Sequence, residues 1–509
     1  MRCVAGAGLL ALVGCNQIFG LTPTKAYDAS IDGVLDMPHV VLDWQIATLF
    51  ASGAPDPMIR FAPIDPVPTV RIAPIDGPFD RDRATYSAGD GSILIPRAYV
   101  NTTWRLEYTL ADGIPHEVQW APDDKLGHLT VPVFGRLARD PVPVGGGYRI
   151  TPVTPPGSYT FPRVFTTGLW TEGVATPSGT SVDYDFSGAT SSSGPNGRPD
   201  PTLGDHALVV DYIADGSTGC RIAVGSAALG SAAIQPGVHT TQMPTWDAGR
   251  KPVMGAPVAF TFITRLGTGL GKLQTNFSSA LSLLLFGAAA STDMPGLAGT
   301  PESATLLGAL FPVPVMQTLL KCPYNTSPLP QTAQPAMLDA FPPVLHVQLV
   351  DTRQVLGVTL SSGMETVIAS VPGTGFTMAF PAAIPTQFQL ATPASGVVDL
   401  AGTTDQLAVG APTGSFVLSF TPEAAAGLRA DYFDVVVHRI AGGALSTERI
   451  YTVTAPTVRI DGALFAPGAD YVFEVRSYKG HPKAQHGDFA PVDYPYGAAI
   501  VFTRTFKAS

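Results

Sequence analysis

The densest group of chemically competent side chains lies near the C-terminal end of the sequence, in Lys479, His481, Lys483, His486 and Asp488. These five residues stand out because only 14% of the chain is charged. Two histidines could ligate a metal ion, and the whole set could recognise a polar partner if a rigid scaffold held the loop. Two interpretations stay open, a possible binding loop and a solvated loop without a ligand.

A second candidate is the run Asp183-Tyr184-Asp185-Phe186-Ser187-Gly188, in which oxygen-bearing side chains alternate before a glycine. A calcium-binding loop begins in this way. The twelfth position is Gly194, however, where such a loop has a glutamate that supplies two oxygens. Asp200 or Asp205 could contribute from the flanking segment, so the alternatives are a structural calcium ion and a polar hairpin without metal, of which we expect the hairpin.

Linear signatures of catalysis are missing from the sequence. There is no Gly-x-Ser-x-Gly elbow, no His-Glu-x-x-His zinc helix and no Gly-x-x-x-x-Gly-Lys phosphate loop. His116-Glu117 lacks the second histidine that a metal-binding helix face needs. We therefore expect no catalytic residue, cofactor or metal. The enzymatic alternative is a glycan or peptide hydrolase with paired carboxylates in residues 141–390, because such a pair needs no linear motif.

The first residues predict export. Arg2 precedes the uncharged segment Val4–Val13, which has the length of a signal-peptide core and is too short to span a membrane. The core ends in Leu12-Val13-Gly14-Cys15, which resembles the lipobox of bacterial lipoproteins. The resemblance implies that residues 1–14 are removed, that the Cys15 sulfur carries a diacylglycerol and that the new amino group is acylated. Two or more acyl chains make a stable membrane anchor.

The residues after Cys15 extend this prediction. Asn16 and Gln17 follow the cysteine, in place of the aspartate that retains some lipoproteins at the inner membrane, which favours the outer membrane. Residues 15–30 are expected to be a short tether. Cys220 and Cys322 would then be a possible disulfide in an oxidising periplasm, closing a loop of about 100 residues and stabilising the fold by up to about 4.7 kcal/mol. Two separate buried thiols are the alternative.

Composition indicates an exported, mainly β protein. The chain has 509 residues, enough for roughly two to four domains. Its 53 glycines and 48 prolines disfavour long helices and favour short strands joined by turns. The net charge is −10, from 30 basic and 40 acidic residues, and the basic residues do not cluster. Nucleic-acid binding is therefore not expected, because it needs a concentrated basic face.

Residues 31–140 are predicted to form a small β-sandwich. Arg60–Asp65 and Arg71–Asp76 nearly repeat one proline-containing sequence and are expected to be two similar extended edge segments. From Thr103 to Leu110, apolar and polar residues alternate, which predicts a strand with one buried and one exposed face. The run Asp90-Gly91-Ser92 with Ile95-Pro96 resembles the transthyretin-like sandwiches of secreted bacterial proteins.

Residues 141–390 are predicted to form a larger β-sandwich, because turns rich in proline and glycine separate many short apolar runs. Two short helices are expected within it. One covers residues 276–287, where asparagine and serine capping candidates precede an apolar run. The other begins at Thr300-Pro301-Glu302, which has a cap, a proline in the first turn and an acid near the positive end of the helix dipole.

Residues 408–508 give the most specific structural prediction. The segment Phe465-Ala466-Pro467-Gly468 leads to Tyr471 and an alternating strand, and this resembles the E-F corner and F strand of fibronectin type III domains. The resemblance implies a β-sandwich in which the Tyr471 hydroxyl bonds back to the corner backbone. Phe420 stands where the family usually has a core tryptophan on its B strand. The resemblance also makes Lys479–Asp488 the F-G loop.

Taken together, the sequence predicts tandem β-sandwich domains with few short helices, on a protein anchored to the outer membrane and facing the periplasm or the cell surface. Its expected function is non-enzymatic: an interaction or scaffold protein whose partner is an unknown envelope protein or glycan. The alternatives are the hydrolase with a site in residues 141–390 and an accessory subunit of an envelope complex.

Overall fold

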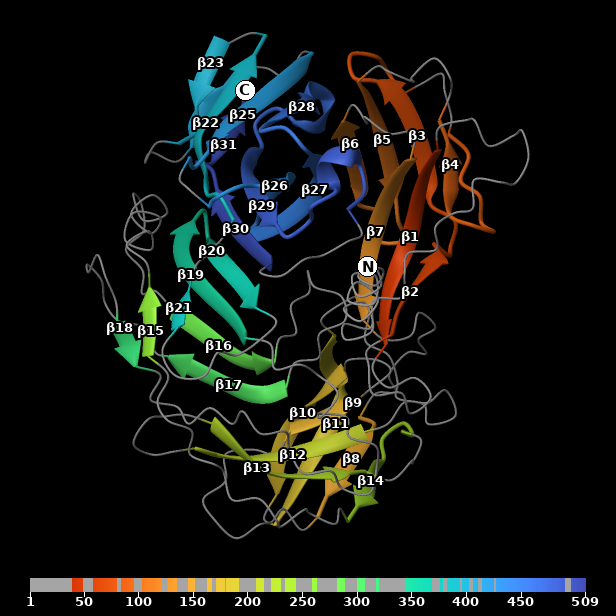
Figure 1. Ribbon diagram of the computed structural model, residues 1–509, viewed down its shortest axis with the longest axis vertical. Helices are drawn as coiled ribbons and strands as arrows, with labels where there is room; N and C mark the ends of the chain where they lie inside the picture. Colours follow the sequence, from red (N-terminus) through yellow and green to blue (C-terminus); the bar gives the residue numbers. More distant parts are fainter. Residues whose placement is uncertain are drawn as a thin grey trace, which may run out of the picture.

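Strands make up almost all of the regular structure in the computed structural model of the chain (Figure 1), which confirms the predicted mainly β fold with several sheets. Among the residues described below, the helical elements are two short 3-10 helices, η4 (Gly462–Leu464) and η5 (Ala484–His486). Within the described ranges, no helix is long and apolar enough to cross a membrane. The structure describes residues 39–48, 58–79, 84–95, 103–120, 126–134, 145–151, 163–166, 171–178, 180–191, 207–214, 221–229, 234–243, 259–262, 282–288, 300–306, 317–319, 345–368, 376–378, 382–393, 396–401, 406–410, 414–424, 427–489 and 496–509.

The N-terminal sandwich, residues 39–134, has two sheets around one apolar core. One sheet contains β1 (His39–Thr48), β2 (Met58–Pro63), β4 (Ser92–Leu94) and β7 (Leu126–Phe134). The other contains β3 (Thr69–Pro74), β5 (Trp104–Thr109) and β6 (Pro115–Trp120). The two near-repeat segments form β2 and β3, each the outermost described strand of its sheet, so the predicted pair of edge segments is confirmed.

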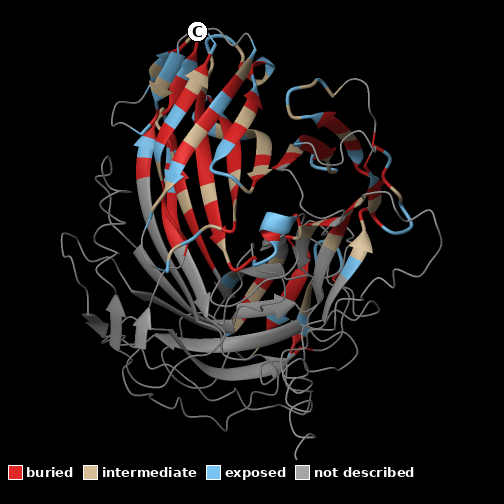
Figure 2. Ribbon diagram, turned by 45° about the horizontal axis from the view of Figure 1, so that its top comes forward, coloured by how far each residue is buried: buried red, intermediate tan, exposed pale blue. Residues whose placement is uncertain are grey.

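In the C-terminal sandwich, a four-stranded sheet packs against a continuation of the sheet that contains β3, β5 and β6 (Figure 2). Its four-stranded sheet has the order β23-β22-β25-β28, with β22 starting at Pro385, so this sandwich takes in strands that the sequence analysis assigned to residues 141–390. Its second sheet holds β26, β27, β29, β30 and β31, and β24 joins through β31. The bounds are β22 (Pro385–Thr392), β23 (Gly396–Asp399), β24 (Leu407–Val409), β25 (Ser415–Pro422), β26 (Tyr432–Ala441), β27 (Ala444–Val453), β28 (Thr457–Asp461), β29 (Asp470–Lys479), β30 (Tyr496–Phe502) and β31 (Phe506–Ala508).

The corner before β29 has the geometry predicted for Tyr471. Its hydroxyl oxygen accepts a hydrogen bond from the Ala466 amide at 2.8 Å and donates to the Leu464 carbonyl at 3.4 Å. The ring is buried in the core of the C-terminal sandwich and packs edge-on against Phe465. Phe420 also lies in this core, where it contacts Phe433 edge-on at 5.0 Å between ring centroids. Phe420, the residue at which the sequence departs from the family's tryptophan, is thus a buried aromatic of this core.

One sheet runs through both sandwiches, because β6 pairs in parallel with β27 (Figure 1). Successive side chains of a strand point to opposite faces. On β5 and β6 the face with Leu106 and Val118 packs in the N-terminal core. The opposite face carries Glu117, which is in register with Tyr451 of β27, and Tyr451 lies in the C-terminal core. The two sandwiches therefore use opposite faces of the shared sheet.

Strands between residues 147 and 378 form the remaining structure. A seven-stranded sheet has the order β13-β12-β9-β10-β11-β8-β14, and β15, β18 and β21 form a three-stranded sheet. The strands β16, β17, β19 and β20 extend the shared sheet beyond β30. The bounds are β8 (Gly147–Ile150), β9 (Arg163–Thr166), β10 (Thr171–Ser178), β11 (Ser181–Ser191), β12 (Ala207–Ala214), β13 (Arg221–Ala228), β14 (His239–Gln242), β15 (Ala259–Phe262), β16 (Ser282–Ala288), β17 (Thr300–Leu306), β18 (Gln317–Leu319), β19 (Leu345–Val355), β20 (Val358–Ile368) and β21 (Phe376–Met378).

The two predicted helices are wrong. The expected helix over residues 276–287 contains instead the start of β16, and the helix expected from Thr300 is β17. The two strands pair antiparallel, and β16 also pairs with β19. Short apolar runs do not distinguish a buried strand from a buried helix, and here sheet pairing overrides the capping signals at the start of each segment.

Candidate functional site

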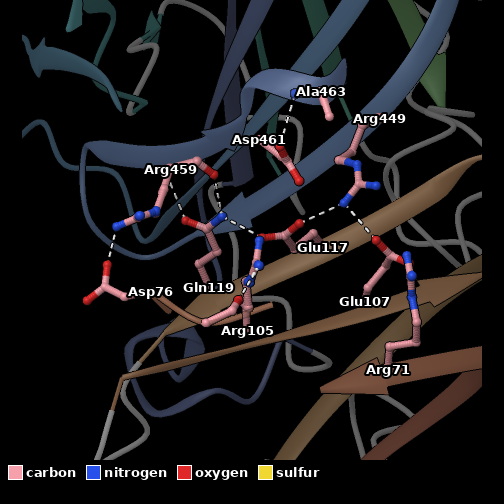
Figure 3. A network of polar contacts seen from close by, with 11 residues as sticks. Arg71, Asp76, Arg105, Glu107, Glu117, Gln119, Arg449, Arg459, Asp461 and Ala463 are labelled. Atoms are coloured by element: carbon pink, nitrogen blue, oxygen red, sulfur yellow. Dashed lines mark hydrogen bonds and ion pairs between the residues drawn. The ribbon is translucent and has the colours of Figure 1, made fainter. Parts of the chain in front are cut away.

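The strand β5 is buried on both faces, although its alternation predicted one exposed face. Arg105 and Glu107 point away from the N-terminal core and are 9% and 3% exposed. Their burial follows from the pairing of β6 with β27, which places the C-terminal sandwich over this polar face. We call this contact and the polar side chains around it the joint (Figure 3), which comprises Arg71, Asp76, Arg105, Glu107, Glu117, Gln119, Arg449 and Arg459.

Two glutamates lie at the centre of the joint. Glu107 and Glu117 are directly opposite each other across β5 and β6, and Arg71 is opposite Glu107 on β3. Like charges in such positions repel, so a cation must separate them. Arg449 of β27 does this: its Nη1 lies 2.7 Å from Glu107 Oε2 and 2.8 Å from Glu117 Oε2. Arg71 holds the other oxygen of Glu107, with Nε at 2.7 Å.

Burial sets the electrostatics of this cluster. The side chains of Glu107 and Glu117 are 4% and 0% exposed. Burial raises the pKa of Glu117, and the nearby Arg105 and Arg449 guanidiniums offset only part of that rise. Phe79 covers the cluster, with its ring centroid 4.1 Å from the Arg105 guanidinium carbon. Both carboxylates are thus ion-paired and shielded, an arrangement suited to holding two sandwiches together and not to reaching a substrate.

Gln119 connects the joint to the four-stranded sheet through hydrogen bonds to the backbone of β28. Its side-chain amide donates to the Arg459 carbonyl at 2.7 Å and accepts from the Arg459 amide at 3.0 Å. A neighbouring strand would make the same two contacts, so Gln119 replaces a strand at the edge of β28. The same amide also donates to Glu117 Oε1 at 2.7 Å. The Arg459 side chain pairs with Asp76 of the N-terminal sandwich (Figure 3).

The possible binding loop lies against the N-terminal sandwich. Asp431 anchors its start: one carboxylate oxygen accepts hydrogen bonds from the Gly480 and His481 amides, both at 2.8 Å, and lies 3.6 Å from Lys479 Nζ. His481 is buried, and its Nδ1 is 3.0 Å from the carbonyl oxygen of Phe489. Lys483 and His486 are exposed. The two histidines therefore differ in exposure: His481 packs inside the protein, whereas His486 is exposed to solvent.

The end of the same loop pairs with the edge of β7 at His128. The His128 amide donates to the Gly487 carbonyl, and the Phe489 amide donates to the His128 carbonyl, both at 2.9 Å. Asp488 forms a parallel bridge with His128 and is partly exposed. Among these five predicted residues, Lys483 and His486 thus offer exposed side chains, while Lys479, His481 and Asp488 lie in a segment that serves domain packing.

A second buried polar group lies on the outer face of the C-terminal sandwich. His438 Nε2 is 2.8 Å from Glu474 Oε2, and Arg476 Nε donates to the other oxygen of Glu474 at 2.5 Å. Burial would raise the pKa of Glu474, but the hydrogen bonds and charges of His438 and Arg476 outweigh it, so the pKa is lowered. Thr447 Oγ1 lies 3.3 Å from His438 Nδ1. These contacts tie β26, β27 and β29 together.

The calcium candidate is part of a hairpin. Asp183–Gly188 lies within β11, which pairs with β10, so the expected polar hairpin is present. Asp183 forms a two-point contact with Arg149, at 2.6 and 2.7 Å. These hydrogen bonds lower the pKa of Asp183. No cluster of three potential metal ligands occurs among the residues that the structure describes.

Other predicted positions lie outside the described residues. These are the segments 1–14 and 15–30, with Cys15, and the two cysteines of the possible disulfide, Cys220 and Cys322. Most side chains of residues 141–390, where the hydrolase alternative places its carboxylates, also lie outside them.

Sequence reasoning missed the joint. Glu117 entered only as part of an incomplete zinc motif, and Arg449 was not singled out. A signal was present: in a chain with 14% charged residues, β5 and β6 carry charged or amide side chains at alternating positions, Arg105, Glu107, Glu117 and Gln119. Such a polar stripe predicts an exposed face, and nothing in the local sequence reveals that a strand from residues 444–453 covers it.

No protein-family model and no curated protein matches this sequence. Among solved structures, the chain is similar to the insect immune protein hemolin, whose structure is described as a new domain arrangement with implications for homophilic adhesion. The identity is 10%, the TM-score is 0.12, and the alignment covers 86% of this chain and 94% of hemolin. A TM-score of this size carries no argument about fold or function.

Proposed function

We propose that the chain is an exported envelope protein, lipid-anchored at Cys15 in the outer membrane, that acts as a non-enzymatic interaction or scaffold protein. The observation that carries the scaffold part is the joint. Its buried carboxylates and guanidiniums pair with one another and connect two sandwiches through one sheet. Charges that pair with one another inside the protein favour a structural role, in which the two sandwiches hold binding surfaces in place, over a reaction centre.

The C-terminal sandwich is, in this proposal, a fibronectin type III-like module. Two observations support this: the Tyr471 hydroxyl bonds back to the backbone of the preceding corner, and Phe420 is buried in the same core as Tyr471. Loops at the ends of such a sandwich are held by rigid strands and are suited to contacting partners. Lys483 and His486 are among the exposed side chains of the F-G loop.

Lipid anchoring is tested by Cys15→Ala, with Cys3→Ala as the matched control. Cys15→Ala is expected to move the protein from the membrane fraction to the soluble fraction, because the acceptor of the acyl chains is gone. Cys3→Ala lies in the segment that the proposal removes and should leave the protein in the membrane fraction. Retention of the Cys15→Ala protein by membranes contradicts the anchor.

The scaffold role is tested by photo-cross-linking in intact cells. A photoreactive residue replaces Val397, which is 65% exposed on the four-stranded sheet, or Lys483 in the loop. One dominant cross-linked protein in near-stoichiometric yield supports a scaffold or a subunit of an envelope complex. Capture of envelope glycan without a protein partner, together with its cleavage by the purified chain, contradicts the non-enzymatic proposal and directs attention to residues 141–390.

A further inference from the structure

The core of the N-terminal sandwich contains residues from the far end of the sequence. Ala484 is 0% exposed and Phe489 is 8% exposed, and both pack in the same cluster as Leu42, Trp104 and Leu106. Tyr432 packs against this cluster as well. Without these side chains, one side of the core would be exposed to water. Removal of a buried aromatic side chain is among the changes that lower the stability of a domain most.

Backbone and charged groups of the N-terminal sandwich depend on the same distant segment. Residues 116–119 of β6 complete their ladder with residues 450–453 of β27, and the His128 amide and carbonyl find their partners at Gly487 and Phe489. Glu117 has a fully buried side chain that Arg449 neutralises at 2.8 Å. A buried carboxylate without its cation and a buried amide without its acceptor both destabilise a fold.

The dependence runs in one direction. The main core of the C-terminal sandwich consists of residues between 364 and 508 and contains none from residues 39–134. Its sheets are closed by pairs such as β22 with β25 and β26 with β29, all within the C-terminal part of the chain. This sandwich therefore carries its own core and shares the β27–β6 ladder, whereas the N-terminal sandwich also takes core side chains from residues 484 and 489 and the cation of Glu117 from Arg449.

We infer that residues 39–134 form a stable sandwich only together with residues 432–489, so the first domain of the chain folds last. The partners in the joint are more than 300 residues apart in sequence, for example Gln119 and Arg459 at a separation of 340. Contacts of such separation form late, because a long loop must close first. If the chain is exported as proposed, its N-terminal part stays unfolded during transfer, until residues 432–489 have emerged.

A cleavable chain tests this inference. A protease site is inserted between Met243 and Ala259 of the Cys15→Ser protein. The protein is folded, cut and separated into its two pieces under mild denaturant with a reductant, which opens a Cys220–Cys322 disulfide if one has formed. Amide hydrogen exchange in β5, β6 and β7 is expected to be at least about a hundredfold faster in the isolated N-terminal piece than in the uncut chain. Adding the C-terminal piece should restore the slow exchange. Exchange in β25 and β26 of the C-terminal piece should be unchanged throughout.

Slow exchange of β5, β6 and β7 in the isolated N-terminal piece overturns the inference. A second measurement avoids any effect of the inserted site. In the uncut chain, Phe489→Ala should accelerate exchange in β5 and β7 by about a hundredfold while β25 keeps its protection. Phe416→Ala, in the core of the C-terminal sandwich, is the matched control and should accelerate exchange in both sandwiches. Equal effects of the two variants on β25 contradict the one-way dependence. Both readouts are the same whether or not Cys15 carries lipid, so their failure is distinct from failure of the proposed function.

Discussion

At the scale of single residues, Arg449 has an unusual position because one guanidinium nitrogen serves two glutamates on neighbouring strands. Taking charges out of water is costly, and a buried pair is sensitive to the loss of either partner. The joint therefore depends on Arg449 far more than on Arg71, which contacts the same Glu107 but has a side chain that is 41% exposed.

This difference predicts the outcome of two identical substitutions. Arg449→Met is expected to lower the free energy of unfolding by about 3–5 kcal/mol, because it leaves two carboxylates buried without their shared cation. Arg71→Met should lower it by less than about 1 kcal/mol, since water screens that pair. Urea denaturation of both variants measures the difference. Equal losses in the two variants would show that Arg449 is not the cation that holds the joint.

Two buried glutamates should give opposite pH dependences. The pKa of Glu474 is lowered in the folded protein, so its stabilising contribution is present above the usual carboxyl pKa and is lost as the pH falls through the folded value. The pKa of Glu117 is raised, so its contribution is complete below the usual pKa and is lost as the pH rises through the folded value.

Glutamine variants at the two positions test these signs. Glu474→Gln is expected to lose most stability relative to the parent chain near neutral pH, and the deficit should shrink as the solution becomes acidic. Glu117→Gln should instead improve relative to the parent as the pH rises. Free energies of unfolding from urea titrations between about pH 3 and pH 7 provide the comparison. Curves with the same slope for both variants contradict the assignment of opposite pKa shifts.

At the scale of elements, the edge of β28 shows how a side chain can complete a sheet. Gln119 meets both the amide and the carbonyl of Arg459, and it is itself only 7% exposed. An unpaired strand edge is a site of unwanted pairing, and covering it is a common solution. Here the covering residue, Gln119, belongs to the neighbouring sandwich, so the edge of β28 is protected only while the joint is formed.

Gln119→Leu is expected to lower the free energy of unfolding by about 1–3 kcal/mol. The side-chain volume is kept, while two partly buried backbone groups of Arg459 and one oxygen of Glu117 each lose a hydrogen bond. The matched control is Gln354→Leu. The Gln354 amide contacts Thr359 on the exposed side of a hairpin, so this change should be close to neutral. Thermal or urea denaturation of both variants measures the effect. A Gln119→Leu protein as stable as the Gln354→Leu protein would falsify the role of Gln119 as a strand substitute.

At the scale of the whole molecule, the chain is a set of sheets that share strands across domain boundaries. The sheet that ends at β3 on the N-terminal side continues through β6, β27 and β20 to β17 (Figure 1). Sequence boundaries drawn at changes of pattern, such as residue 140 or residue 408, do not coincide with boundaries of this sheet. A strand carries information about its own two faces but none about which distant strand pairs with its edge.

The sequence by itself determined the fold class, the edge character of β2 and β3 and the Tyr471 corner, because each follows from local composition, proline placement or a contact between residues close in sequence. Three features follow from tertiary contacts alone: the joint, the packing of the loop 479–489 on the N-terminal sandwich, and the strand conformation of residues 282–288 and 300–306. The reason is physical. A polar strand face is predicted to be exposed and a polar loop to be solvated, and both predictions fail when a segment more than 300 residues away in the sequence packs on them and excludes water. Glu117 is the clearest example: its local sequence predicts an exposed carboxylate, whereas the fold buries it beside Arg449 in an ion pair that links two sandwiches.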